Sequence, residues 1–326
     1  MYQIENMTGK NVLITDGTGF IGSNLAEKCI ELGANVEIFT KSAEKINNLR
    51  KIKNNVCLTQ GDIWNYPEIE SAILGKDVVF HLAAQTSHFV SMENPVLDVE
   101  INLVGTMNVL EACRRINKNC KIISVGTVSQ SGIAKMLPIS ESTIDWPIEL
   151  YSANKLICEK YMQIYHKAHG LKTCFLRLGT IYGDGQQLDN PRRGITNFFI
   201  GRISRNGPIT IYGDGKFKRD YVYVGDVVDA LILAAQNEKA IGESFLLGGE
   251  IMYFVDMVKN VIESANKILN KEAAVKFVDF PKDEKKIDVG DTEIDFNKIT
   301  KFLGWIPKTK FKDGIEKTIK SYGGKP

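Results

Sequence analysis

A short apolar strand followed at once by a glycine-rich turn and a helix most constrains the fold of this chain. Residues 12–14 form an apolar run that predicts a buried parallel strand, and residues 23–32 carry apolar side chains at helical spacing. Backbone N–H groups and the positive end of the helix dipole would form an anion site there. The alternative is a purely structural turn. We predict a dinucleotide site made by the intervening residues Asp16, Gly17, Gly19, Phe20, Ile21 and Gly22.

Strand and helix patterns alternate through the first two thirds of the chain. Helical patterns at residues 99–117 and 151–169 stand between apolar runs that predict further strands at residues 36–39, 56–58, 78–83, 121–124 and 173–178. This alternation predicts an α/β fold with a doubly wound parallel sheet of the Rossmann type. In such sheets ligands bind beyond the carboxyl ends of the strands, where the candidate site residues fall.

The pattern changes after about residue 180. Glycine, proline and aromatic residues become more frequent, and the helical and strand segments become short and mixed. We therefore expect residues 1–180 to form a dinucleotide-binding domain that also carries the catalytic residues. Residues 181–326 would mainly form a smaller mixed α/β lobe that binds substrate, with some segments returning to the large domain.

Composition excludes several other classes of function. The 326 residues are 44% apolar and 25% charged, which is ordinary globular composition. A net charge of +2 indicates no nucleic-acid or membrane partner, and no apolar run approaches the ~18 residues of a membrane span. The N-terminus does not resemble a signal peptide. The six scattered cysteines show no metal-binding spacing, so we expect reduced thiols, no metal site and a cytoplasmic protein.

A tyrosine and a lysine stand four residues apart at Tyr151 and Lys155. On a helix that spacing places both side chains on one face, one turn apart. An ammonium beside a phenol favours the phenolate, so we expect Lys155 to lower the pKa of Tyr151 from its ordinary value near ~10. Such a phenol can take a proton from a hydroxyl or return one to a carbonyl. Read with Thr127 and the upstream glycine turn, the pair predicts proton transfer beside a bound dinucleotide.

Further motifs stand in a fixed order along nearly the whole chain. They are Gly17-Thr-Gly-Phe-Ile-Gly22, Gly61-Asp62-Ile63, His81-Leu-Ala-Ala-Gln85, the segment 102–111, Gly126-Thr127, Tyr151-Ser-Ala-Asn-Lys155, the segments 176–183 and 213–224, and Leu303-Gly-Trp305. With these motifs the chain resembles the extended short-chain dehydrogenases/reductases, in the branch of nucleotide-sugar epimerases, dehydratases and ketoreductases. The resemblance implies an NAD(P)-dependent cytoplasmic enzyme of polysaccharide biosynthesis whose substrate is a nucleotide-diphosphate sugar.

The resemblance also assigns roles in catalysis. Tyr151 would be the acid/base, and Lys155 would tune its pKa and bind the nicotinamide ribose. Thr127 would hydrogen-bond the hydroxyl or carbonyl of the sugar. Asn102 would support the proton relay from its helix; the alternative is a surface or capping amide.

The resemblance assigns ligand contacts to further residues. Asp62 and Ile63 would contact the adenine, and Ala83 and Gln85 would line the dinucleotide groove. Arg219 would hold the pyrophosphate of the sugar nucleotide, since a guanidinium forks onto phosphate oxygens, unless it forms a surface ion pair with Asp220. Two more positions match phosphate contacts of relatives, namely Thr180, where many carry an amide, and Lys285, roughly where many carry an arginine.

Two departures from the family pattern concern the cofactor. Asp16 replaces the first turn glycine, and a carboxylate repels phosphate. Either it accepts ribose hydroxyls or it weakens cofactor binding. The second strand ends at Thr40, Lys41 and Ser42, where an acid normally binds the ribose 2′-hydroxyl of NAD. The missing acid and the added lysine favour NADP over NAD.

A third departure concerns the reaction. Val128 and Ser129 stand where dehydratases of this branch carry an Asp-Glu pair, so we disfavour a 4,6-dehydratase. We expect hydride transfer at C4 of an NDP-hexose by a 4-epimerase. One alternative is an NADPH-dependent reductase of an NDP-4-keto-6-deoxyhexose, which would use the same three residues. Another is a non-catalytic nucleotide-binding protein whose cofactor site Asp16 has spoiled. Relatives form dimers through the helices that carry Asn102 and Tyr151, so a homodimer is expected.

Overall fold

The computed structural model describes residues 2–42, 46–280, 288 and 290–322. Within them the largest sheet has seven strands, all parallel to their neighbours. In sheet order the strands are β10 (Ser244–Leu247), β6 (Lys172–Leu178), β5 (Lys121–Thr127), β4 (Val78–His81), β1 (Asn11–Thr15), β2 (Asn35–Thr40) and β3 (Val56–Gln60). The order reverses between β1 and β4, and a crevice for ligands forms at such a reversal.

The strands are apolar because both faces of the sheet are covered. In β1, Val12 and Ile14 belong to one buried cluster, whereas Leu13 between them belongs to another. Successive side chains of a strand point to opposite faces, so a strand covered on both sides needs a continuous apolar run. This confirms the interpretation of residues 12–14.

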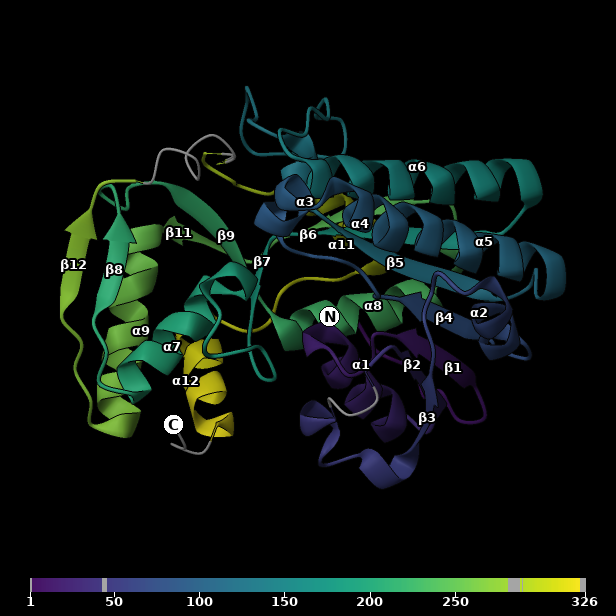
Figure 1. Cartoon of the computed structure of the whole chain (residues 1–326), viewed down its shortest axis with the longest axis horizontal. Coiled ribbons are helices and arrows are strands. Elements are labelled where there is room, and N and C mark those ends of the chain that lie inside the picture. Colours follow the sequence, from purple (N-terminus) through teal and green to yellow (C-terminus); the bar gives the residue numbers. More distant parts are fainter. Residues whose placement is uncertain (1, 43–45, 281–287, 289, 323–326) are drawn as a thin grey trace.

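Helices cover both faces of this sheet, as the right half of Figure 1 shows. The cluster of Val12 and Ile14 includes side chains of α1 (Phe20–Glu31), α8 (Val224–Gln236) and α11 (Asn297–Leu303). The cluster of Leu13 includes side chains of α2 (Tyr66–Ile73), α5 (Gly105–Ile116) and α6 (Leu150–His169). The doubly wound parallel sheet predicted from the sequence is therefore confirmed.

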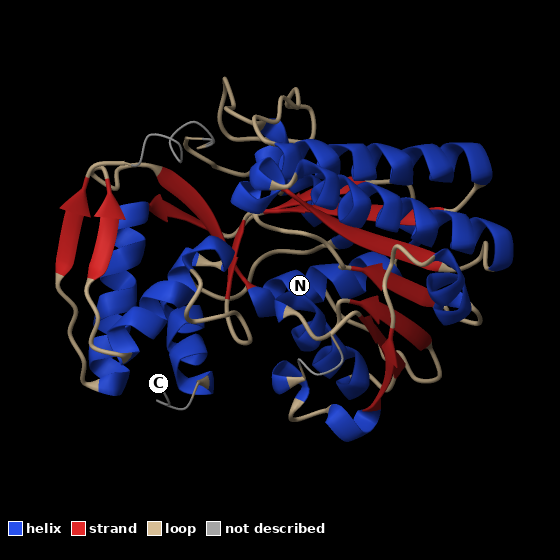
Figure 2. Cartoon of the chain, in the orientation of Figure 1, coloured by secondary structure: helices blue, strands red, loops and turns tan. Residues whose placement is uncertain are grey.

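A second, smaller group of elements lies beside the large sheet, at the left of Figures 1 and 2. It contains the three-stranded sheet β11 (Glu250–Tyr253), β9 (Lys218–Tyr223) and β7 (Thr180–Tyr182), and the parallel pair β12 (Val275–Val278) and β8 (Ile209–Tyr212). The helices α7 (Ile195–Ser204), α9 (Phe254–Leu269) and α12 (Phe311–Ser321) share one buried cluster with side chains of β7, β8 and β9. Strand β10 and helices α8 and α11, although late in the chain, pack with the large sheet instead.

Several element boundaries differ from the sequence-based expectation. Strand β4 ends at His81 rather than at residue 83, because the backbone N–H groups of Leu82 and Ala83 donate to the Thr15 hydroxyl, both at 3.0 Å. Strand β5 continues to Thr127. The helix expected at residues 99–117 begins earlier, as α4 (Pro95–Val99), and passes through a π-helical turn at Glu100–Val104 before α5. A short helix, α3 (His88–Glu93), precedes it.

None of the helices in the described part of the chain is both long enough and apolar enough to cross a membrane.

Candidate active site

A cavity of about 840 Å³ opens at the carboxyl ends of the strands of the large sheet. It lies beyond the ends of β1 and β4, where the strand order reverses, and it extends to the segment that follows β7. The structure brings many of the sequence-predicted site residues together here, namely Asp16, Gly19, Phe20, Ile21, Gly22, Thr40, Lys41, Ser42, Thr127, Tyr151 and Lys155. The cavity is therefore the candidate active site.

The glycines of the first turn are required by close contacts. A Cβ atom at Gly17 would lie 2.7 Å from the Ile38 side chain, and one at Gly22 would lie 2.4 Å from the Asp16 carbonyl oxygen. A Cβ atom at Gly19 would lie 2.5 Å from the Asp16 carboxylate. Asp16 itself has φ 56°, in the left-handed region that favours glycine. The turn thus keeps the tight shape of a phosphate-binding loop although an aspartate holds its first position.

The residues expected to read the cofactor ribose lie at the cavity rim. Thr40 is buried, and its hydroxyl lies 3.1 Å from the Thr18 hydroxyl. The Thr40 hydroxyl also accepts a hydrogen bond from the backbone N–H of Ser42 at 3.3 Å. The Lys41 ammonium lies 2.8 Å from the Asp62 carboxylate and 5.0 Å from the centre of the Trp64 ring. Lys41 and Asp62, which were predicted as separate cofactor contacts, are therefore partners of each other.

Three of the four predicted catalytic side chains line the cavity and come from two neighbouring elements. Thr127 ends β5, where its hydroxyl accepts the N–H of Ser129 at 3.1 Å. Tyr151 and Lys155 lie in the first turns of α6, and both are buried. All three line the cavity, so a sugar hydroxyl placed there would meet a phenol, an alcohol and an ammonium.

The expected effect of Lys155 on its neighbour is not found. Burial raises the pKa of Tyr151, and the negative charges of Glu149 and Asp98 raise it further. Burial also lowers the pKa of Lys155. The prediction that the chain itself lowers the pKa of Tyr151 was wrong, because it considered one helix neighbour and omitted the desolvation that tertiary packing imposes.

Asn102 and Gln85 form hydrogen bonds that hold the loop after β4, and neither residue lines the cavity. The buried Asn102 carboxamide accepts the Gln85 N–H and donates to the Gln85 carbonyl, both at 3.1 Å. The Gln85 side chain donates to the Asp98 carboxylate at 2.6 Å. Neither Gln85 nor Ala83 lines the cavity in the described structure; the alternate residues of that extended loop do, namely Leu82, Ala84 and Thr86.

Three more residues predicted to bind the cofactor, Gly17, Asp62 and Ile63, also fall outside the cavity lining. Ile63 is buried between α2 and α5, where a Cβ atom at Gly105 would lie 2.4 Å from its side chain. Its side chain therefore belongs to the core.

The predicted substrate contacts lie elsewhere. Thr180 in β7 does not line the cavity, although Gly179 and Ile181 on either side of it do. The Arg219 guanidinium donates to the Asp288 carboxylate at 2.8 Å and stacks over Phe217, so it is neither at the cavity nor paired with Asp220. Lys285 lies outside the described residues.

Sequence reasoning missed two cations and a histidine that line the cavity. Arg192 and Arg193 come from the 3₁₀ turn Pro191–Arg193, between β7 and α7. His88 is the first residue of α3. The adjacent arginines were a visible signal, because two cations in the substrate lobe of a protein that binds diphosphates suggest anion contacts. The histidine had no such signal.

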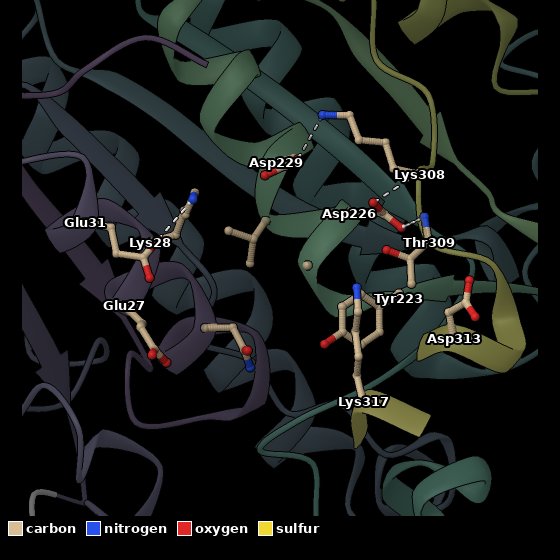
Figure 3. Close-up of a pocket in the computed structure, with 13 residues that line it drawn as sticks. Glu27, Lys28, Glu31, Tyr223, Asp226, Asp229, Lys308, Thr309, Asp313 and Lys317 are labelled. Carbon is tan, nitrogen blue, oxygen red and sulfur yellow. Dashed lines mark hydrogen bonds and ion pairs between the residues drawn. The ribbon is translucent and has the colours of Figure 1, made fainter. Parts of the chain in front are cut away.

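A second cavity, of about 460 Å³, lies between α1, α8 and the C-terminal segment (Figure 3). Its charges are largely paired among themselves: Lys28 with Glu31 at 3.0 Å, and Lys308 with Asp229 at 3.7 Å. The Asp226 carboxylate accepts the backbone N–H groups of Lys308 and Thr309. Thr127, Tyr151 and Lys155 line the larger cavity, and no catalytic residue predicted from the sequence is among the described residues that line this one. The contacts of Asp226 and Asp229 with Lys308 and Thr309 therefore hold the C-terminal segment against α8.

No cluster of three or more histidine, cysteine, aspartate or glutamate side chains placed to hold a metal ion occurs within the described ranges.

Comparisons with known proteins agree with this geometry. The family model described as GDP-mannose 4,6 dehydratase matches residues 13–318. CDP-paratose 2-epimerase of Salmonella typhi is 30% identical, over 94% of this chain and 97% of that protein. UDP-glucose 4-epimerase of Thermotoga maritima, solved with UDP-glucose, is 30% identical with a TM-score of 0.86, over 96% of this chain and 98% of that one.

A third relative was solved with a dinucleotide. UDP-glucose 4-epimerase of Thermus thermophilus, in complex with NAD, is 30% identical with a TM-score of 0.84, over 96% of this chain and 99% of that one. Together with the parallel sheet, the glycine turn and the Thr127, Tyr151 and Lys155 arrangement, these similarities extend over nearly the whole chain. The chain belongs to the extended short-chain dehydrogenase/reductase family, in its branch of NAD-dependent nucleotide-sugar epimerases and dehydratases.

Proposed function

We propose that this protein is a nucleotide-sugar 4-epimerase that works by reversible hydride transfer at C4 of an NDP-hexose. The observation that carries the proposal is that Thr127, Tyr151 and Lys155 face the same cavity as the glycine turn. A sugar bound against Tyr151 would thus lie beside a dinucleotide bound at the turn. Both similar solved structures named above are UDP-glucose 4-epimerases, which supports this choice of carbon.

The proposed mechanism assigns one task to each side chain. The Tyr151 phenolate takes the proton of the C4 hydroxyl, while the Thr127 hydroxyl holds that oxygen in place. Lys155 stabilises the phenolate by its charge. A bound nicotinamide cofactor would accept and return the hydride, and its positive ring would oppose the charges that raise the pKa of Tyr151. After the 4-keto sugar turns in the cavity, Tyr151 returns the proton and the opposite configuration results.

The residues present fit a dinucleotide. Gly17, Gly19 and Gly22 stand where side chains would collide, so the backbone at the start of α1 stays open to a pyrophosphate. Lys41, which lines the cavity and pairs with Asp62, would contact the adenosine half. For the sugar nucleotide, we propose that Arg192 and Arg193 supply the cations for its diphosphate in place of Arg219.

A second candidate is the one-way, NADPH-dependent reduction of an NDP-4-keto-6-deoxyhexose. The observation in its favour is Lys41, whose side chain is 71% exposed at the cavity and forms an ion pair with the carboxylate of Asp62. A surface pair of that kind contributes little stability, so the ammonium is available to a 2′-phosphate. Dehydration remains disfavoured, because Val128 and Ser129 place no carboxylate next to Thr127.

Mass spectrometry of the small molecules released from freshly purified, denatured protein separates the two candidates. Bound NAD supports an epimerase that recycles its cofactor. An empty protein that takes up NADPH on titration supports the reductase. Incubation with UDP-, CDP-, GDP- and dTDP-hexoses, followed by NMR of the products, then identifies the inverted carbon. Wild-type protein that converts none of them contradicts the epimerase.

Removing the Tyr151 hydroxyl tests the catalytic assignment. We expect Tyr151→Phe to slow conversion by about 10²- to 10⁴-fold, because the acid/base group is lost while the ring remains. Tyr161→Phe is the matched control, since it removes a hydroxyl from the same helix outside the cavity. Equal rates for Tyr151→Phe and wild type would refute the role of Tyr151.

A further inference from the structure

A buried carboxylate lies directly ahead of the acid/base tyrosine. Glu149 caps the N-terminus of α6, and its side chain is fully buried. It accepts the backbone N–H of Tyr151 at 2.8 Å, the N–H of Ser152 at 2.9 Å and the Ser91 hydroxyl at 3.2 Å. The Ser152 hydroxyl donates to it as well. Glu149 therefore fixes the backbone that carries the Tyr151 phenol.

The His88 imidazole lies beside this carboxylate. Its Nδ1 atom lies 2.9 Å from Glu149 Oε1. The imidazole also meets the Tyr151 ring edge-on, with the ring centres 5.1 Å apart and the planes at 76°. It lines the cavity, and its side chain is 37% exposed. His88 thus lines the cavity and contacts both the buried Glu149 and Tyr151.

The charges around the phenol are unevenly balanced. Burial is the largest cause that raises the pKa of Tyr151, and the carboxylates of Glu149 before α6 and Asp98 on α4 raise it further. Lys155 on α6 is a cation on the same helix face. Asp98 accepts from two neutral carboxamides, those of Gln85 and Asn154, both at 2.6 Å.

Glu149 is an ionised group in this setting. Burial raises the pKa of Glu149, but the hydrogen bond and charge of His88, together with the bonds from Ser152, leave it below its ordinary value. The Glu149 carboxylate and the His88 imidazole therefore form one unit next to the phenol.

We propose that His88 and Glu149 form a positioning pair for the acid/base residue, in which Glu149 holds the backbone of Tyr151 and protonated His88 balances the carboxylate charge that faces the phenol. The inference rests on the proposed function, because it assumes that Tyr151 transfers the proton. Neither residue exchanges a proton with the sugar in this scheme. Their effect is on how readily the phenolate forms.

Two substitutions, one that removes the positive charge and one that removes the negative charge, test the pair. His88→Asn keeps a hydrogen-bond donor but removes the cation, so the unbalanced Glu149 should make the phenol hold its proton more tightly. Glu149→Gln keeps a capping oxygen but removes the anion, so the phenol should lose its proton more readily. We expect the rising limb of the single-turnover rate against pH to move up by about one pH unit in the first variant and down by about one in the second.

The readout is cofactor reduction followed by absorbance after mixing with the nucleotide sugar, which reports the hydride step alone. His88→Lys keeps a cation at this position and should leave the limb at or below its wild-type place. His88→Phe keeps only the ring contact and should behave like His88→Asn. A purely structural role would lower the rate of all variants without opposite displacements of the limb.

The two possible failures are distinguishable. Wild-type protein that converts no nucleotide sugar contradicts the proposed function and this inference together. A wild-type enzyme that depends on Tyr151, whose limb stays in place in both His88→Asn and Glu149→Gln, overturns the inference alone.

Discussion

Asp16 shows how one residue can keep the shape of a binding loop while changing its charge. Its left-handed φ of 56° is the conformation a turn glycine would adopt, and aspartate tolerates it better than most side chains do. Its carboxylate lies against Gly19, at the start of α1, where the helix dipole would otherwise attract a phosphate. The backbone therefore fits a pyrophosphate better than the side chain does.

This conflict leads to a prediction at the residue scale. Asp16→Gly should raise the affinity for NAD or NADPH by about tenfold, because a carboxylate near a phosphate is removed and the backbone strain is relieved. Asp16→Asn is the control, since it keeps the shape and removes only the charge. Isothermal titration calorimetry measures both. If wild type binds no dinucleotide and Asp16→Gly binds one tightly, the non-catalytic alternative gains; unchanged affinity would show that Asp16 tolerates the cofactor.

At the scale of elements, a buried ion network joins strand β6, helix α6 and the loop before α6. The Arg177 guanidinium donates to Glu159 at 2.6 Å and to Asp145 at 2.5 Å, and all three side chains are largely buried. Gln130 donates to Glu159 at 2.8 Å and accepts the backbone N–H of Thr127 at 3.1 Å. The network thus connects the sheet to the backbone of a predicted catalytic residue.

Breaking this network should be costly. Arg177→Met leaves two buried carboxylates without a cation, so we expect the free energy of unfolding to fall by about 3–5 kcal/mol. Lys259→Met, which removes a cation from an exposed pair on α9, should change it by less than about 1 kcal/mol. Chemical denaturation followed by circular dichroism measures both. Equal stabilities of the two variants would mean that the Arg177 network does not hold the elements together.

At the scale of the whole molecule, the helical layer of α5 and α6 leaves apolar side chains exposed. Val104, Ile157 and Ile164 are exposed there, and Ile157 and Ile164 are two turns apart on one face of α6. Figure 1 shows these two helices side by side on the outer side of the large sheet. We propose that a second copy of the chain covers this face, as expected from the family resemblance.

The dimer proposal has a direct test. Light scattering with size-exclusion chromatography should give twice the mass of one chain for the wild type. It should give the mass of one chain for Ile164→Glu, because a carboxylate cannot be buried in an apolar interface. Phe277→Glu is the control, since Phe277 is similarly exposed, at 56% against 54%, but lies on β12 in the smaller layer. A monomeric wild type, or a dimer that survives Ile164→Glu, would contradict the proposed face.

The sequence alone was sufficient to predict the doubly wound sheet and several of the residues that meet at the carboxyl ends of its strands. Local patterns suffice there, because strands buried on both faces need apolar runs, and the chain order of strand, turn and helix places Asp16, Thr40 and Thr127 at one edge. The spacing of Tyr151 and Lys155 likewise follows from helix geometry alone.

Tertiary structure decided what those local patterns cannot contain. The raised pKa of Tyr151 arises chiefly from burial, to which Glu149, its near neighbour in the chain, and Asp98, which only packing brings near it, both add. Arg219 turns to Asp288, while Arg192 and His88 reach the cavity from other elements. Desolvation, long-range charge and the pairing of β10 with β6 depend on contacts between segments far apart in the chain, and a sequence pattern reports only on its neighbours.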